Sequence, residues 1–348
     1  MTRRGDTWSR RAILALGGST CLLGQEPYLD KRSTPLEYAG PGREQGGKRG
    51  VDVVRIGFFG PGDAAHARAG SIWMGAMLAL EDANRAGGFH GKPFELVERW
   101  SDDVWRSGAS AVVRLAYTDE VWAILGGIDG ATTHLAEQVV TKALLPLVDP
   151  VSTDQTVNHA NVPWMFSCAP GDPAIAAYLA AQLPEGGFTV VAGTDHDSRN
   201  LAREFLKAAA LKHRLPFQRH DIGPGPLNLP ALEGAACVIL APPAETAAVM
   251  AAAPAAMRLL AGPAARSRGF SSERPVVTPR LHSADNSRIQ RLVSRFGRPA
   301  DDFSLLAYDA AQFVVEAIRE AGLNRALIRD RLAPHFGPRG RRIQEVSS

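Results

Sequence analysis

Three stretches decide the fold: VRIGFFGPGD (residues 54–63), GAMLALEDANRAGGFHGKPFELV (75–97) and VWAILGGIDGATTHLAEQVVTKALLPLVDPVST (121–153). They predict strand, helix, strand, helix and strand in that order. Residues 53–59 are an almost continuous apolar run, which is typical of a strand covered by helices on both faces. The helix expected over 71–86 carries its apolar side chains on one face, and Gly87 and Gly88 end it because glycine tolerates a left-handed C-cap.

The rest of the chain repeats this alternation. Further strands are predicted at 94–97, 121–125, 145–148, 188–192, 237–241 and 258–261, and further helices at 107–117, 132–143, 174–183, 199–213, 245–253 and 304–321. Strands that alternate with helices at this spacing predict a parallel sheet with helices on both sides. The body of about 300 residues is larger than one hydrophobic core usually allows, so two α/β lobes are expected.

The opening motifs resemble the type I periplasmic binding proteins, specifically the branched-chain amino acid (Leu/Ile/Val) binding family of ABC transporters. The shared features are an apolar IG strand, an amphipathic helix that ends in GG, and a short GK turn, and the resemblance runs from about residue 55 to about residue 332. It implies two Rossmann-like lobes, each a parallel sheet flanked by helices, joined by a hinge that the chain crosses three times. The implied N-terminal lobe is 51–167 plus 279–328, and the C-terminal lobe is 168–275 plus 332–348.

The resemblance also implies a function. A solute is captured in the cleft between the lobes and delivered to an ABC permease in the membrane, and the binding protein is expected to be a monomer. A ligand sensor or regulatory module of the cell envelope on the same fold remains an alternative, because a fold does not determine a function.

The N-terminus has the features of an export signal. Arg10 and Arg11 form a twin-arginine pattern before a modestly apolar stretch over 12–24, which is shorter than the ~20 residues that a membrane-spanning helix needs. We therefore predict a Tat signal over 1–24 and a periplasmic or cell-envelope location, the alternative being a chance arginine pair in a basic tail. Cys21 is a weak candidate for a lipid anchor because Gly18 stands where a lipobox has leucine.

Composition excludes several other classes. Residues 25–50 are rich in Gly, Pro and charge and predict a flexible spacer. The chain carries a net charge of +3, and 1–24 account for all of it, so the body gives no reason to expect nucleic acid as a partner.

Cys168 and Cys237 lie in apolar stretches and are expected to be buried. No zinc spacing, nucleophile elbow, Walker loop or complete dinucleotide fingerprint is present, so we expect no catalytic residue, cofactor or metal.

The first half of the ligand site is expected at the carboxyl ends of the strands of the N-terminal lobe, where ligands of open α/β sheets bind. The loop 126–133 leads directly into a helix N-terminus, whose free amides and dipole suit a carboxylate or another anion. The resemblance places Asp129, Gly130, Ala131 and Thr132 at the ligand.

The family match in this lobe is partial. Gly130 stands where the family has a serine, although the hydroxyls of Thr132 and Thr133 are close in sequence. The loop after the next strand contributes Val151 through its carbonyl, Ser152, and Thr153, whose hydroxyl the family uses on the ligand's polar head.

The second lobe departs further from the family. Ala264 stands where relatives have an acidic residue that pairs with the amine of an amino acid, and a desolvated charge left unpaired costs several kcal/mol. In the loop 194–200, Asp197 is a substitute carboxylate and Arg199 a candidate for binding an acidic ligand. Alternatively, Asp197 or Ser198 only caps the next helix.

Two other candidates complete this interpretation. A metal site at Asp195, His196 and Asp197 is disfavoured, because consecutive side chains point in different directions and no other residue is seen to complete a set. Tyr308 is expected either to form an aromatic wall beside the ligand or to pack in the core.

Overall fold

The computed structural model describes residues 38, 40–43, 50–268, 270–343 and 346–347, all within the unit Thr34–Ser348.

The first lobe is built on a five-stranded parallel sheet. The first sheet has the order β2-β1-β3-β4-β5. Its strands are β1 (Val54–Phe59), β2 (Phe94–Arg99), β3 (Ile124–Gly126), β4 (Leu147–Asp149) and β5 (Met165–Ser167).

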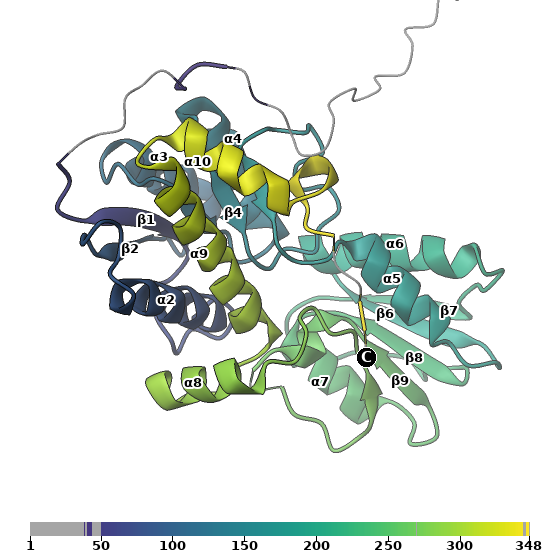
Figure 1. Ribbon diagram of the computed structural model, residues 1–348. Helices are drawn as coiled ribbons and strands as arrows, with labels where there is room; N and C mark the ends of the chain where they lie inside the picture. The colour runs from purple at the N-terminus through teal and green to yellow at the C-terminus, as the bar shows by residue number, and fades with distance from the viewer. Residues whose placement is uncertain (1–37, 39, 44–49, 269, 344–345, 348) are drawn as a thin grey trace, which may run out of the picture. The chain divides into compact units, whose positions relative to one another are not determined.

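The second lobe has a second five-stranded parallel sheet with the order β10-β9-β8-β6-β7. Its strands are β6 (Phe188–Gly193), β7 (Gln218–Ile222), β8 (Ala236–Leu240), β9 (Arg258–Ala261) and β10 (Val276–Val277). Both sheets are parallel throughout. The predicted fold of two parallel-sheet α/β lobes is therefore confirmed (Figure 1).

Helices cover both faces of each sheet. In the first lobe α2 packs against α9 on one face and α3 against α4 on the other, while in the second lobe α5 and α6 lie side by side opposite α7. The helices are α2 (Gly70–Arg85), α3 (Ala109–Tyr117), α4 (Gly130–Ala143), α5 (Asp172–Ala181), α6 (His196–Ala210), α7 (Pro243–Ala252), α8 (Asn286–Phe296), α9 (Asp302–Ala321) and α10 (Arg325–Leu332). A side chain at Gly75 would clash with the backbone of α9, since its Cβ would lie 2.1 Å from the Ser304 carbonyl. The close packing of α2 on α9 therefore requires glycine there.

The chain passes between the lobes three times. It leaves the first sheet after β5, returns after β10 to form α8 and α9, and comes back to the second lobe through its last residues. On this last crossing Arg341 is bridged in parallel to Ser167 of β5, in the first sheet, and Ser347 is bridged in antiparallel fashion to Arg280, which follows β10. These are the three crossings expected from the family resemblance.

Some elements were not predicted from the sequence. β7 alternates partly buried and exposed positions at a sheet edge, and β5 has only three residues. In α8 the only residue that is buried is Leu292. These segments and the polar α10 are either too short or too polar to show a periodic pattern of apolar residues, so the sequence does not predict them. A π-helical turn, Val104–Gly108, precedes α3, where the prediction had one helix over 107–117.

Part of the expected spacer contacts the first lobe. The ring of Tyr38 packs edge-on against Trp164, with 4.7 Å between centroids. Arg43 forms an ion pair with Asp330 of α10. The export signal expected over 1–24 lies outside the described residues, and the exact lobe boundaries stay a prediction.

Candidate functional site

The start of α4 is built by its own loop. Asp129 is the N-cap: its carboxylate accepts a hydrogen bond from the Thr132 amide at 2.8 Å and another from the Thr132 hydroxyl at 2.7 Å. The Thr133 hydroxyl donates to the Asp129 carbonyl at 2.7 Å and accepts from the Gly127 amide. The two threonine hydroxyls, which were candidates for the ligand, are therefore engaged in shaping the helix N-terminus.

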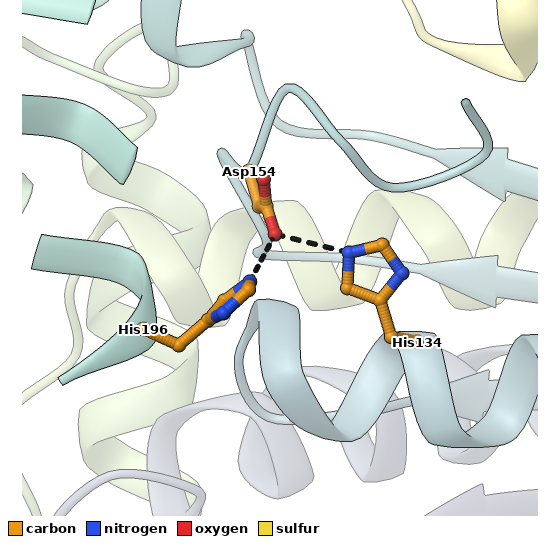
Figure 2. A group of neighbouring side chains, drawn as sticks. All are labelled: His134, Asp154 and His196. Carbon is orange, nitrogen blue, oxygen red and sulfur yellow. Dashed lines mark hydrogen bonds and ion pairs between the residues drawn. The ribbon is translucent and has the colours of Figure 1, made fainter. Parts of the chain in front are cut away.

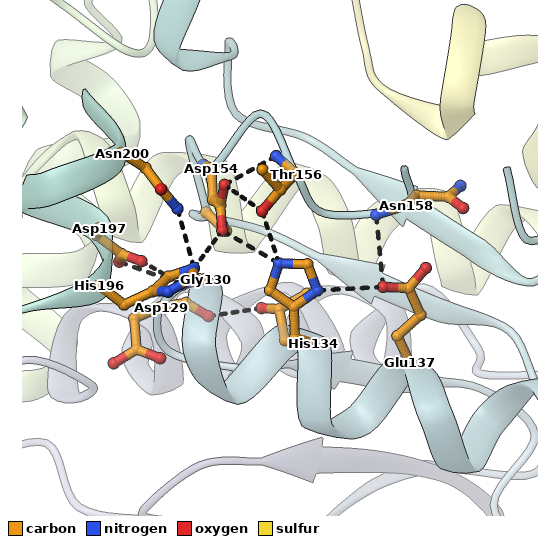
Figure 3. Close-up of polar contacts among 12 residues, drawn as sticks. Asp129, Gly130, His134, Glu137, Asp154, Thr156, Asn158, His196, Asp197 and Asn200 are labelled. Atoms are coloured by element: carbon orange, nitrogen blue, oxygen red, sulfur yellow. Dashed lines mark hydrogen bonds and ion pairs between the residues drawn. The ribbon is translucent and has the colours of Figure 1, made fainter. Parts of the chain in front are cut away.

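A carboxylate from the second lobe lies on this helix N-terminus. The Gly130 amide donates to both carboxylate oxygens of Asp197, each at 3.1 Å (Figure 3). Arg68 pairs with Asp129 at 2.8 Å and lies 4.0 Å from Asp197. A Cβ at position 130 would lie 2.5 Å from an Asp197 oxygen, so glycine is required for this approach. The predicted anion site is thus occupied by the protein's own carboxylate.

The electrostatics of Asp197 reflect this position. Burial and, next, the neighbouring Asp129 together raise the pKa of Asp197 to about 6, against the lowering effects of Arg68 and of the Gly130 amide. Asp197 does not cap α6, and neither does Ser198. The N-cap is Asp195, whose carboxylate accepts from the Ser198 amide at 3.0 Å. Asp197 is therefore free to reach across to the first lobe.

Next to this contact, two histidines converge on one buried carboxylate (Figure 2). One oxygen of Asp154, Oδ2, lies 3.2 Å from Nε2 of His134 and 2.7 Å from Nε2 of His196. Asp154 is in the loop after β4, His134 is on α4, and His196 is the first residue of α6. The cluster therefore joins both lobes.

Hydrogen bonds decide the charge states in this cluster. Burial alone would raise the pKa of Asp154, but hydrogen bonds from His134, Thr156 and His196 outweigh it and hold that pKa well below its usual range. Hydrogen bonds to Asp154 and then to Glu137 raise the pKa of His134 to about 9 despite partial burial. At neutral pH His134 is thus a cation between two carboxylates.

Sequence reasoning missed this cluster. Asp195, His196 and Asp197 do point in three directions, as expected: to the α6 amides, to Asp154 and to Gly130. No other ligand was expected beside His196, whereas the structure places His134 and Asp154 there, with the possible ligating atoms of the three residues all within 4.8 Å of one another. The contact of His196 with the other two depends on the pairing of the lobes, which no local sequence pattern encodes. The available signal was that both lie beside predicted site loops.

The second predicted loop, 151–153, is held by buried polar groups. The Asp149 carboxylate accepts from the amides of Val151 and Ser152, each at 3.0 Å. The guanidinium of Arg341, from the third crossing, donates to the carbonyls of Ser152 at 3.0 Å, Asp154 at 2.8 Å and Ala169 at 2.9 Å. The loop therefore takes its shape from a residue near the end of the chain.

A buried carboxyl group faces Thr153. The Asp172 amide donates to the Thr153 carbonyl at 2.7 Å, while neither Asp172 carboxyl oxygen has a hydrogen bond of good geometry. Burial raises the pKa of Asp172 to about 8, against the lowering effect of the nearby Thr153 hydroxyl. Burial likewise raises the pKa of Asp149 to about 7. Thr153 therefore lies at the rim of a region where carboxyl groups favour their neutral form.

Two predicted site residues lie apart from these contacts. The Tyr308 hydroxyl donates to Asp82 of α2 at 2.7 Å, and the Arg288 guanidinium lies 4.2 Å from the centre of the Tyr308 ring. Arg199 is exposed on the first turn of α6. The structure thus brings together the 129–132 loop, the 151–153 loop and Asp197, and leaves Tyr308 in helix packing.

Two surface pockets of the structure lie elsewhere. One of about 500 Å³ is formed by α2 and α8, and one of about 250 Å³ lies beside Arg280 and Arg342. Neither is lined by a predicted ligand residue. Where a ligand was expected, the polar side chains of the two lobes contact one another.

The sequence can now be compared with known proteins. A profile of the periplasmic binding protein family matches residues 53–333. The chain belongs to this family. Among curated proteins, an "Amino acid binding protein" of Pseudomonas aeruginosa is 35% identical over 119 residues, which are 33% of this chain and 31% of that protein. The match thus spans about a third of the length of that relative.

Solved structures agree with the family. The branched-chain amino acid substrate-binding protein LivJ of Streptococcus pneumoniae, in complex with isoleucine, has a TM-score of 0.74 at 18% identity, covering 84% of this chain and 94% of LivJ. A leucine-binding protein, LivK, of Thermotoga maritima has 0.69 at 19% identity, covering 81% and 88%. A solute-binding protein of R. palustris in complex with benzoate has 0.68 at 12% identity, covering 83% and 88%. At these identities the likeness establishes the type I periplasmic binding protein fold, as the motifs predicted. None of the described helices has the length and apolar character needed to cross a membrane.

Proposed function

We propose that this periplasmic binding protein captures a small polar solute between its two lobes and delivers it to an ABC permease. One observation carries the proposal: the N-terminus of α4 in the first lobe and the first turn of α6 in the second meet at Gly130 and Asp197. An interface of polar groups at the carboxyl ends of two parallel sheets is where such folds hold ligands.

The contact between Gly130 and Asp197 suggests the class of ligand. The Asp197 carboxylate takes the hydrogen bond that a bound carboxylate would take at a helix N-terminus. Isoleucine and benzoate, which are bound in two of these structural relatives, and leucine, after which LivK is named, all carry a carboxylate. On this proposal, the lobes separate, a carboxylate ligand replaces Asp197 on Gly130, and the lobes close again.

The partner group on the ligand is open to two possibilities. Since Ala264 supplies no charge for an ammonium, a branched-chain amino acid is expected to bind poorly unless the displaced Asp197 pairs with its amine. An organic acid without an amine needs no such partner, and it should bind more tightly if Asp197 is removed.

Calorimetry of the full chain and of Asp197→Ala, with benzoate, dicarboxylates, amides and amino acids, tests this proposal. For an organic acid, Asp197→Ala should tighten binding by about tenfold, because it removes a competing charged hydrogen bond. For an amino acid held by Asp197, the same change should weaken binding. Asp221→Ala, which removes an exposed carboxylate from β7, is the control. Equal affinities in wild type and Asp197→Ala for every ligand would contradict the placement of the site.

Transport and sensing are separated by reconstitution. A binding protein for transport stimulates ATP hydrolysis by its permease in vesicles when the ligand is present. Ligand binding without any such stimulation by the permease encoded beside it would favour the envelope sensor instead.

Export and assembly are part of the same proposal. A reporter fused to residues 1–30 should cross the membrane by the folded-protein route, with Cys21 as a possible site of lipidation. Unchanged export after Arg10→Lys combined with Arg11→Lys would contradict a Tat signal. We further propose that the exported protein is a monomer without nucleic-acid partners, which light scattering and a DNA-binding assay test.

A further inference from the structure

We propose that His134, Asp154 and His196 bind a divalent transition-metal ion, zinc in the first instance, which links the two lobes. The proposal is independent of which solute the protein carries. It rests on the geometry of the three side chains, on the groups around them and on the burial of the carboxylate.

The geometry requires small movements. Both imidazoles direct Nε2 toward the same Asp154 oxygen, at 3.2 and 2.7 Å, and the three ligating atoms lie within 4.8 Å of one another. Two ligands that are each about 2.1 Å from a tetrahedral ion lie about 3.4 Å apart. Sub-ångström shifts of the two imidazole–carboxylate contacts would therefore admit an ion between the three groups (Figure 2).

The ligand set selects the type of metal. Two imidazoles and one carboxylate suit zinc and its neighbours nickel, cobalt and copper, whereas magnesium and calcium prefer oxygen ligands. Three protein ligands leave one position of a tetrahedral ion open. Oδ2 of Asp154 itself lies beside the α4 N-terminus, since a Cβ built at Gly130 would lie 2.8 Å from it.

The surrounding groups orient the ligands as in known metal sites. Nδ1 of His134 lies 3.5 Å from Glu137, so a carboxylate faces the nitrogen that would not bind the ion (Figure 3). The Thr156 amide and hydroxyl both donate to Oδ1 of Asp154 at 2.8 Å, which leaves Oδ2 for the ion. The side-chain nitrogen of Asn200 lies 3.0 Å from Nε2 of His196, the nitrogen that would bind the ion, so Asn200 has to move aside when the ion binds.

The charge of Asp154 also favours an ion. Its side chain is fully buried, and its ion pairs among the described residues are both with histidine. A divalent cation bound at Oδ2 would give this buried carboxylate a permanent counter-charge. Binding is then expected to hold α4 and α6 together.

The test is a titration of the full-length protein, stripped with a chelator, with zinc, nickel, cobalt and magnesium chlorides. We expect one equivalent of zinc, nickel or cobalt to bind, with visible absorption of the cobalt form and no comparable binding of magnesium. His196→Asn and His134→Gln should each weaken zinc binding by at least tenfold. His196 is 41% exposed, so its replacement is not expected to prevent folding, which circular dichroism checks.

The control is His282→Asn, which changes another histidine 3.0 Å from an aspartate. It should leave zinc affinity unchanged. The proposal is overturned if the stripped wild type binds none of the three transition metals, if the folded His196→Asn and His134→Gln variants bind zinc as the wild type does, or if His282→Asn weakens binding as much as they do.

Discussion

Asp154, which is buried, and Asp309, which is half-buried, each face histidine, yet their surroundings differ in one respect. Asp154 is paired with His134 and His196. Asp309 of α9 is paired with one histidine, His282 at 3.0 Å, and with two arginines, Arg288 at 2.8 Å and Arg342 at 3.1 Å. The pKa of both carboxyl groups is lowered, because the hydrogen bonds and charges of their neighbours outweigh burial.

The difference lies in whether the cations are permanent. Arginine keeps its charge at all accessible pH values and presents a fixed fork of donors, so the Asp309 cluster is a structural connection between α9, α8 and the last crossing. Histidine exchanges its proton for a metal ion, so the Asp154 cluster can change state. The same aspartate–histidine contact thus serves structure in one place and is open to ligands in the other.

The largest effect is expected from removing the carboxylate of the arginine cluster. Asp309→Asn should lower the free energy of unfolding by about 2 to 3 kcal/mol, because Arg342 loses its ion pair with Asp309 and Arg288 keeps the longer pair with Asp285, at 3.4 Å. Zinc affinity should not change. Urea denaturation measures the first quantity and calorimetry the second, with Asp221→Asn as an exposed control. A loss below about 1 kcal/mol would mean that the arginines find other partners.

The next effect separates a binding residue from both clusters. Thr153→Val should weaken the carried solute by about ten- to a hundredfold, which corresponds to the loss of one hydrogen bond worth roughly 1.5 to 3 kcal/mol to a charged group. The melting temperature of the empty protein should stay nearly the same, and Thr118→Val on the surface should change neither. If Thr153→Val lowers the melting temperature and leaves solute affinity intact, the hydroxyl serves Asp172 rather than a ligand.

A third variant converts one cluster into the other kind. His196→Arg places a permanent cation beside Asp154 and should weaken zinc binding by at least tenfold. The free energy of unfolding should fall by less than about 1 kcal/mol. A titration with zinc and a denaturation curve measure both quantities. Zinc binding that survives this change would show that His196 is not a ligand.

The last prediction concerns the pH dependence of stability and a buried aspartate, Asp172, that has neither histidine nor arginine as an ion-pair partner in the part of the chain that the structure describes. The folded protein holds a proton on Asp172 up to a pKa of about 8, whereas the unfolded chain releases it near pH 4. The free energy of unfolding should therefore fall as pH rises between these values, by up to about 1.4 kcal/mol per pH unit. Arg341 and Asp154 face this group and keep their charges over the whole range, whereas Asp197, whose pKa is about 6, titrates within it.

The control for this slope is Asp172→Asn, which keeps the shape and cannot lose a proton. Its free energy of unfolding, relative to that of the wild type, should be higher at pH 8 than at pH 5. A smaller pH dependence of stability should remain, which comes from Asp149, whose pKa is about 7. Identical pH profiles of wild type and Asp172→Asn would mean that Asp172 is charged when folded.

Much of the fold could be predicted from the sequence, because buried parallel strands such as β1 and β8 are continuous apolar runs and α2 has a clear helical period. Edge and polar elements such as β7 and α8 could not, since most of their side chains face away from the core. The expected position of the site rests on the rule that ligands bind at strand ends, and it stays a prediction. The contacts of His134 with Asp154, and of Asp197 with Gly130, could not be predicted, because they depend on how residues distant in sequence meet.

Arg341 has a consequence for the order of folding. Its guanidinium holds the Ser152 carbonyl, which lies 189 positions earlier in the chain. Contacts of such long sequence separation form late, because the entropy of closing the intervening loop is lost before the contact is gained. The 151–154 loop is therefore expected to reach its final shape only in the last step of folding, after both sheets have formed. Refolding measured by a probe in this loop should be slower than refolding measured by a probe in either sheet.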